Sequence, residues 1–159
     1  MGKVLSTFTN GWAGAISRSL DDVVVPLANK SGAALPYGVP VALDANHTGV
    51  VRFDANTHTA AEFVGITVRA PAKTSDAYGG NTGSYDVSDV VDVLVRGHIV
   101  AAVDNWVGAL GDVISVKKSD GKFAVGTGND YLALSNVRIS AAPDDASNAE
   151  LVITERNVI

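Results

Sequence analysis

The stretch that decides the fold is VVDVLVRGHIVAAV, residues 90–103. Every second residue in it is apolar or small, and these residues share one face: Val91, Val93, Val95, Gly97, Ile99, Ala101 and Val103. The opposite face carries Asp92, Arg96 and His98. A period of two over this length predicts a long β-strand with a buried face. Gly97 is a candidate bend, because a residue without a Cβ lets another backbone approach.

Further short strands are predicted on both sides of this one. Each is rich in valine or another β-branched residue and is bounded by Gly, Pro, Asn or Asp. The expected strands cover residues 21–27, 38–44, 50–53, 62–69, 112–118, 122–125, 135–141 and 149–156. Asp120 and Gly121 predict a hairpin turn between two of them, because glycine adopts positive φ at no steric cost. Many short strands without long helices indicate an all-β sandwich or closed barrel.

The composition fits one globular domain. The chain has 159 residues, and its hydrophobic fraction of 47% against 18% charged residues is the opposite of a disordered segment. Twelve Lys and Arg against 17 Asp and Glu give a net charge of −5, so we expect no nucleic acid partner. Cysteine is absent, which excludes disulfides, thiolate catalysis and cysteine-bound metals. No apolar run reaches the length of a membrane span or of a signal peptide core.

Two regions do not follow the strand pattern. Residues 1–20 carry Phe8 and Trp12, and residues 70–85 carry Tyr78 and Tyr85 on a Gly- and Ser-rich background. Residues 10–20 are the one segment that could form a helix, although two glycines disfavour it. Aromatic residues on polar segments are candidates for anchors that dock on a neighbouring molecule. Alternatively, they cover the ends of the β-domain.

We find no pattern typical of an enzyme. His47 and His58 lie in polar turns, as solvated side chains or, less plausibly, as a pair of metal ligands. No nucleophile elbow accompanies any histidine, and neighbouring carboxylates at i and i+1 in a strand point to opposite faces. We therefore expect no catalytic residue, no metal site and no cofactor.

Five short motifs occur in a fixed order along the chain. The first is the Gly-aromatic stretch at residues 11–12, and the second is Pro36-Tyr37-Gly38 with Val41. The third consists of Phe63, Gly65 and Ile66, the fourth is the strand of residues 91–97, and the fifth is Arg156-Asn157. Together, over about residues 8–159, they resemble the structural cement (head decoration) proteins of tailed bacteriophages.

The resemblance implies a β-sandwich of jelly-roll type, with a more open β-barrel as the alternative. It implies an extended N-terminal arm at residues 1–20 and a β-sandwich domain at residues 21–159. Such a protein binds the outer surface of the assembled head, bridges neighbouring major capsid subunits, and forms a homodimer or homotrimer on local symmetry axes. It is soluble in the host cytoplasm before assembly and is no enzyme. The candidate capsid-interface residues are Phe8, Trp12, Ile16, Arg18, Tyr78 and Tyr85.

Two other functions remain open at this stage. A carbohydrate- or receptor-binding β module of the virion would use surface aromatics, which Tyr78 and Tyr85 permit. A small hydrolase on a β scaffold is less well supported, because no catalytic constellation accompanies the strands.

The strand at residues 90–103 gives a direct test. Val93→Asp should unfold the domain, because an unpaired buried charge costs several kcal/mol. Thermal melting monitored by circular dichroism measures this, and an unchanged melting temperature would remove the strand assignment.

Overall fold

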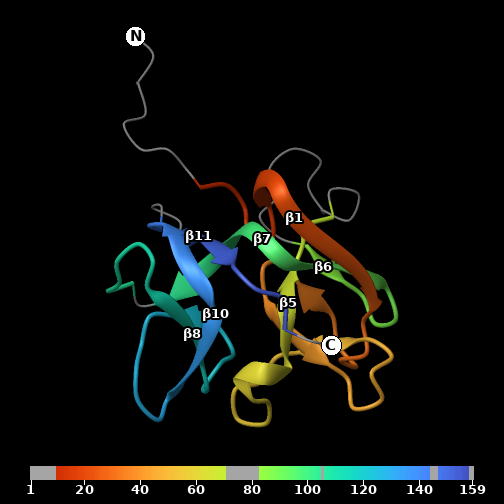
Figure 1. Cartoon of the computed structure of the whole chain (residues 1–159). Helices are drawn as coiled ribbons and strands as arrows, with labels where there is room; N and C mark the ends of the chain where they lie inside the picture. Colours follow the sequence, from red (N-terminus) through yellow and green to blue (C-terminus); the bar gives the residue numbers. More distant parts are fainter. Residues whose placement is uncertain (1–9, 71–82, 105, 144–146, 158–159) are drawn as a thin grey trace.

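The all-β class expected from the sequence is confirmed by the computed structural model of the chain (Figure 1). The structure describes residues 10–70, 83–104, 106–143 and 147–157. Its elements are β1 (Ile16–Ala28), β2 (Leu35–Pro36), β3 (Pro40–Leu43), β4 (Val50–Arg52), the 3-10 turn η1 (Ala60–Glu62), β5 (Phe63–Thr67), β6 (Ser84–Tyr85), β7 (Val90–Asp104), β8 (Val113–Lys117), β9 (Phe123–Ala124), β10 (Tyr131–Ala141) and β11 (Asn148–Ile153).

Five of these strands close a ring. The order runs from β7 through β9, β8 and β10 to β11, which pairs again with β7. The β7–β9 contact is parallel and the other four are antiparallel. The expected hairpin is confirmed, since β8 and β9 pair across the turn at Asp120 and Gly121. The pairing differs from the two facing sheets of a jelly-roll sandwich, and from an open barrel, because the second half of β7 is paired on both edges and the sheet curls on itself.

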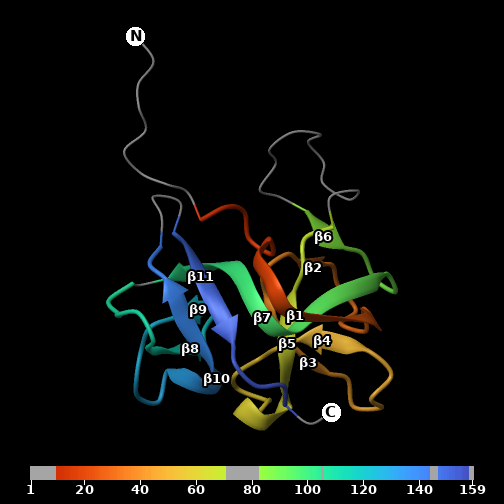
Figure 2. The same ribbon diagram turned by 45° about the horizontal axis from the view of Figure 1, so that its top comes forward.

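The first half of β7 belongs to a second part of the same sheet. Leu94 pairs with Val24 of β1 on one edge and with Ile66 of β5 on the other. Strands β3 and β4 continue outward from β5, and the short ribbon of β2 and β6 covers this part (Figure 2). Strand β7 therefore joins the ring to a smaller sheet.

Two hydrophobic cores follow from this arrangement, and β7 contributes to both. Its predicted buried face is confirmed, because all seven residues of that face are buried. The three that precede Gly97 (Val91, Val93 and Val95) pack in the core of the smaller sheet. The three that follow it (Ile99, Ala101 and Val103) pack in a larger core, which the ring forms together with residues of β3 and β5. The side chains of this one face therefore pack in one core before Gly97 and in the other core after it, and the strand bends at Gly97.

Gly97 is required at this bend for two reasons. Its φ of +119° lies in the region that L side chains rarely adopt. A Cβ there would also lie 2.9 Å from the Cα of Asp22 and collide with its carboxylate. Strand β1 bulges here, between the pairs Arg18–His98 and Val23–Arg96, and Asp22 in the bulge accepts the N–H of His98 at 3.2 Å.

Residues 1–9 of the predicted arm lie outside the described residues, and residues 10–20 differ from the expectation of a loose arm or helix. Strand β1 begins at Ile16, so the predicted boundary between arm and domain at residue 20 falls within a strand. The second glycine of this segment, Gly14, has a φ of +80°, which a helix would not allow. The other predicted strands are all present, with ends that differ by a few residues.

The bend at Gly97 gives a second prediction. Gly97→Ala should lower the free energy of unfolding by at least about 2 kcal/mol, because it adds a clash to the backbone strain. Gly128→Ala is the matched control, since Gly128 also has positive φ but faces open space. Urea denaturation measures both variants, and equal losses would show that Asp22 does not crowd Gly97.

Candidate docking surface

The structure brings three of the six predicted interface residues together and separates a fourth from them. Trp12, Ile16 and Arg18 lie on one continuous segment that crosses β7. Tyr85 lies in the core of the smaller sheet. Phe8 and Tyr78 lie outside the described residues.

The segment of residues 10–15 is fastened to the barrel by hydrogen bonds. The side-chain amide of Asn10 donates to the carbonyl oxygens of Ala142 and Asn148, both at 2.6 Å. The backbone N–H of Gly14 donates to the carbonyl of Val100 at 2.7 Å. These bonds hold the backbone on both sides of Trp12 in a defined position.

Trp12 is held at the surface with 45% of its area exposed. The guanidinium carbon of Arg69 lies 4.3 Å from the centroid of its ring. Such a cation–π contact contributes roughly 0.5–1 kcal/mol at an exposed site. It restricts the rotamers of the indole, so that less entropy is lost when a partner covers the ring.

Strand β1 carries exposed apolar side chains beyond the predicted residues. Ile16, Val23 and Val24 are between 37% and 40% exposed. Val23 and Val24 are neighbours, and both reach the surface because the pairing register with β7 shifts again between them. We call Trp12, Ile16, Val23 and Val24 the β1 face. The sequence indicated a strand at residues 21–27, but a β-branched run does not show which of its side chains stay uncovered.

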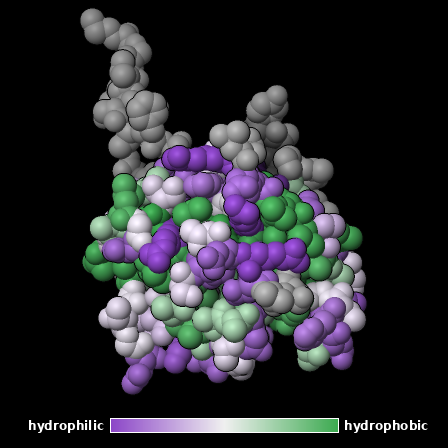
Figure 3. All heavy atoms as spheres, in the orientation of Figure 1, coloured by the Kyte–Doolittle hydropathy of each residue, from purple (hydrophilic) through white to green (hydrophobic). Residues whose placement is uncertain are grey.

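Two ion pairs lie next to the β1 face. The Nε of Arg18 lies 3.0 Å from Oε1 of Glu150, and Arg96 contacts Asp21 at 2.5 Å. Exposed ion pairs of this kind contribute about 0–1 kcal/mol each. Figure 3 shows hydrophilic residues across the middle of this view, with hydrophobic residues on both sides of them. A hydrophilic band thus separates the hydrophobic areas of this view.

Tyr85 is a correction to the predicted interface. It belongs to β6, is 2% exposed, and its hydroxyl donates to the carbonyl of Val68 at 2.7 Å. Its ring meets that of Tyr37 edge to face, with centroids 5.4 Å apart. Burial raises the pKa of Tyr85 from 10.0 to about 12. The Gly- and Ser-rich sequence before Tyr85 predicts a loop, whereas Ser84 and Tyr85 form a short strand that pairs with Leu35 and Pro36.

A second apolar surface lies in the loop between β7 and β8. Val107 is 82% exposed and Leu110 is 65% exposed. Residues 109–112 of the loop are held in place, because the N–H of Ala109 donates to the carboxylate of Asp112 at 2.8 Å and the N–H of Gly111 donates to the carbonyl of Ile139 at 2.8 Å. Neither residue was among the predicted candidates. Leu110 lies between Gly108 and Gly111, and an apolar side chain in such a short Gly-containing loop could have indicated an exposed contact residue.

The histidines and the charged turns do not form a catalytic arrangement. Nδ1 of His58 accepts the N–H of Asp54 at 2.9 Å, so this ring carries its proton on Nε2 and has no lone pair there for a metal. Among the described residues, no group of three or more His, Asp or Glu side chains is placed to hold a metal ion. Within the same ranges, no helix is long and apolar enough to span a membrane.

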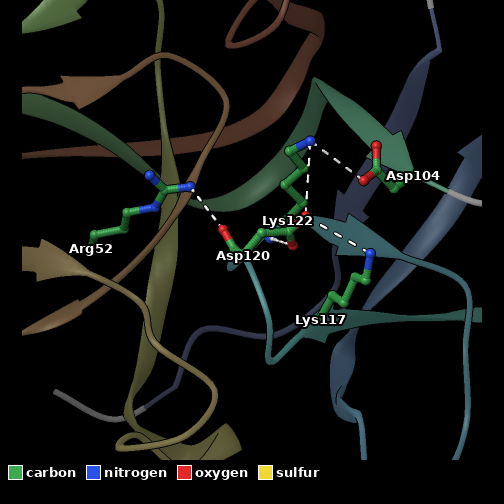
Figure 4. Close-up of polar contacts among 5 residues, drawn as sticks. All are labelled: Arg52, Asp104, Lys117, Asp120 and Lys122. Atoms are coloured by element: carbon green, nitrogen blue, oxygen red, sulfur yellow. Dashed lines mark hydrogen bonds and ion pairs between the residues drawn. The ribbon is translucent and has the colours of Figure 1, made fainter.

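Two lysines near the hairpin tip of β8 and β9, Lys117 and Lys122, form ion pairs. Lys122 lies 3.5 Å from Asp104 and 3.9 Å from Asp120, and Lys117 lies 3.9 Å from Asp120 (Figure 4). Arg52 donates to the backbone carbonyl of Asp120 at 3.2 Å. These contacts connect the turn to β4 and β7, and they neutralise the cations locally.

Comparison with known proteins identifies the family. A family model described as "Structural cement protein (E217 gp24/Pam3 gp6)" matches residues 3–157. The chain belongs to the phage structural cement protein family. The resemblance inferred from the ordered motifs is thereby confirmed, and a structural role in the phage capsid follows from the family. No curated protein matches the chain.

A solved structure supports the same fold for this cement protein. A chain in the structure titled "The capsid of Myoviridae Phage XM1" superposes with a TM-score of 0.74. The alignment covers 97% of this chain and 96% of that chain at 18% identity. At this identity the likeness concerns the fold, and the contacts with a shell have to be argued from this cement protein's own surface.

The burial of Tyr85 gives a third prediction. Tyr85→Phe should lower the free energy of unfolding of this cement protein by about 1 kcal/mol, because the Val68 carbonyl loses its donor. The wild type should also lose stability as pH rises from 10.0 to about 12, since the unfolded chain releases the phenolic proton first, and the variant should lose less. Urea denaturation across this pH range tests both points. Identical pH profiles would contradict them.

Proposed function

We propose that this cement protein binds the outer surface of the assembled head and bridges neighbouring major capsid subunits. The observation that carries the proposal is the β1 face: four exposed apolar side chains held on a fastened segment and an edge strand.

The backbone of β1 adds a second means of attachment. Among the described residues, β1 pairs with β7 alone over its 13 residues. The other edge of β1 therefore carries backbone N–H and C=O groups that an extended segment of another chain can pair with. Backbone pairing and the burial of Trp12, Ile16, Val23 and Val24 would act together.

Bridging requires a second contact surface, and the β7–β8 loop supplies a candidate. Val107 and Leu110 are exposed on a loop in which residues 109–112 are held by hydrogen bonds before any partner arrives. Figures 1 and 2 place this loop, in teal green, on the opposite side of the ring from the far end of β1. A molecule with two separated apolar surfaces can contact two subunits at once.

Modest contacts suffice for such a role. Burial of apolar surface contributes about 25 cal/mol per Å², from which association costs are subtracted. Attachment at two sites makes the second contact intramolecular, and effective affinity rises without further contacts. The β1 edge is also the place where a second copy would pair in the homodimer or homotrimer that we expect.

A carbohydrate-binding module is less well supported by the described surface. Of the two tyrosines that favoured it, Tyr85 is buried and so offers no face to a sugar ring.

Removing apolar surface from the β1 face tests the proposal. The double variant Val23→Thr, Val24→Thr keeps β-branched side chains and should fold normally, while its affinity for emptied heads falls roughly tenfold. The measurement is co-sedimentation with heads stripped of cement protein, together with thermal melting. Val87→Thr is the matched control, since Val87 is 52% exposed outside the β1 face.

Two outcomes would contradict the proposal. If the wild-type protein does not bind stripped heads, the proposed function is wrong. If the double variant binds at full occupancy, the β1 face is not the contact surface. Cryo-electron microscopy of the decorated heads would show whether each copy contacts two shell subunits or only one.

A further inference from the structure

A cavity lies at the end of the molecule remote from the segment of residues 10–15. It measures about 420 Å³ and opens between the β3–β4 turn, η1 and the start of β5. In Figures 1 and 2 the yellow η1 lies at the bottom and the red segment that leads into β1 lies at the top. Neither the β1 face nor the β7–β8 loop contributes to this cavity.

Part of the cavity wall is apolar. Leu43 and Ala61 line it with accessible side chains that offer a surface for a hydrocarbon stem, and Phe63 and Val64 lie buried beneath them. Its volume is several times that of one long side chain. The cavity can therefore accept a whole side chain together with the adjoining backbone of a partner.

Apart from His47 and His58, the titratable groups that line the cavity are acidic. Asp44 and Glu62 contribute carboxylates, and neither Lys nor Arg is among the lining residues. Hydrogen bonds from the N–H and hydroxyl of Thr59 lower the pKa of Glu62. Partial desolvation raises the pKa of Asp44, but the N–H groups of Gly49 and Thr48 outweigh it and the pKa is lowered. Both carboxylates are ionised at neutral pH, so the cavity favours a cation.

One carboxylate oxygen is free to bind that cation. Thr59 donates its N–H to Oε2 of Glu62 at 2.7 Å and its hydroxyl to the same atom at 2.9 Å. Oε1 of Glu62 has no hydrogen-bond partner among the described residues. Asp44 differs, because both of its oxygens accept hydrogen bonds within its own turn. Of the two carboxylates, Glu62 is thus the one that can accept a hydrogen bond from a bound cation.

The aromatic ring in the cavity wall is held in a fixed orientation. His58 stacks on Phe53, with centroids 5.4 Å apart and planes 29° apart. The acceptor bond at its Nδ1 fixes the rotation of the ring. A flat ring next to a free carboxylate oxygen matches a guanidinium group, which is planar and combines hydrogen bonding with stacking.

We propose that this cavity receives an arginine side chain from a neighbouring chain of the phage shell. The methylene stem lies on the apolar wall and the guanidinium donates to Oε1 of Glu62. Lysine suits the site less well, because its ammonium is compact, strongly hydrated and unable to stack. This inference rests on the proposed function for the source of the arginine, while the chemistry of the cavity can be tested without any shell.

The binding test uses small probes and the full chain. Acetyl-arginine amide is titrated against the ¹⁵N-labelled protein and followed by the amide resonances of Ala61, Phe63 and Asn157. Acetyl-citrulline amide, of the same shape but neutral, is the matched probe. We expect saturable shifts with the arginine probe and roughly tenfold weaker binding of the citrulline probe.

Variants separate charge from shape. Glu62→Gln keeps an acceptor for Thr59 and removes the charge, so it should weaken the arginine probe roughly tenfold without loss of fold. Ala61→Leu should block the cavity sterically, and Ala109→Leu is its control on another exposed loop. Asp130→Asn removes a negative charge from an exposed residue that does not line the cavity, and should leave binding unchanged.

Three results would overturn the inference: no saturable shift with the arginine probe, equal binding of citrulline, or preference for acetyl-glutamate amide. Equal binding of citrulline would show an apolar pocket for a neutral segment, and a glutamate preference would show an anion site. None of these depends on heads, so failure here leaves the proposed function intact. A protein that binds the arginine probe but never decorates heads would refute the function alone.

Discussion

The fold depends on one strand that supplies side chains to two hydrophobic cores. Strand β7 buries Val93 in the smaller sheet and Ile99 in the closed ring, and it changes core at Gly97. Because a pleated strand presents alternate side chains to opposite faces, one continuous apolar face can serve two cores only if the backbone turns between them. The positive φ of Gly97 supplies that turn, and the bulge of β1 accommodates it.

The docking surfaces are consequences of this constraint. The second half of β7 is committed to closing the ring, whereas β1 follows the bend and pairs with β7 along one edge only, within the described residues. Its other edge and the side chains of Ile16, Val23 and Val24 consequently remain uncovered. In the loop that carries Val107 and Leu110, residues 109–112 are held by hydrogen bonds and do not need to be ordered by a partner.

Much of this could be predicted from local patterns, and the errors have a common cause. The alternation in residues 90–103 located β7 and its buried face, and the Asp-Gly pair located the turn between β8 and β9. Tyr85 was misplaced because its burial depends on the contact of β6 with β2, some fifty residues earlier in the chain. His47 and His58 were correctly placed in polar turns, but the cavity that they line together with Glu62 forms only when η1 packs beside the β3–β4 turn.

The sequence by itself determined the class of fold, the absence of thiol chemistry, the acidic balance and, through the order of its motifs, the family. Those properties are local or additive, so periodicity, composition and motif order record them. Tertiary structure alone decided that five strands close into a ring, that Val23 and Val24 stay exposed while Tyr85 does not, and that Glu62 keeps a free oxygen in a cavity. Pairing partners and burial depend on which distant segments meet, and a single sequence carries no direct record of those contacts.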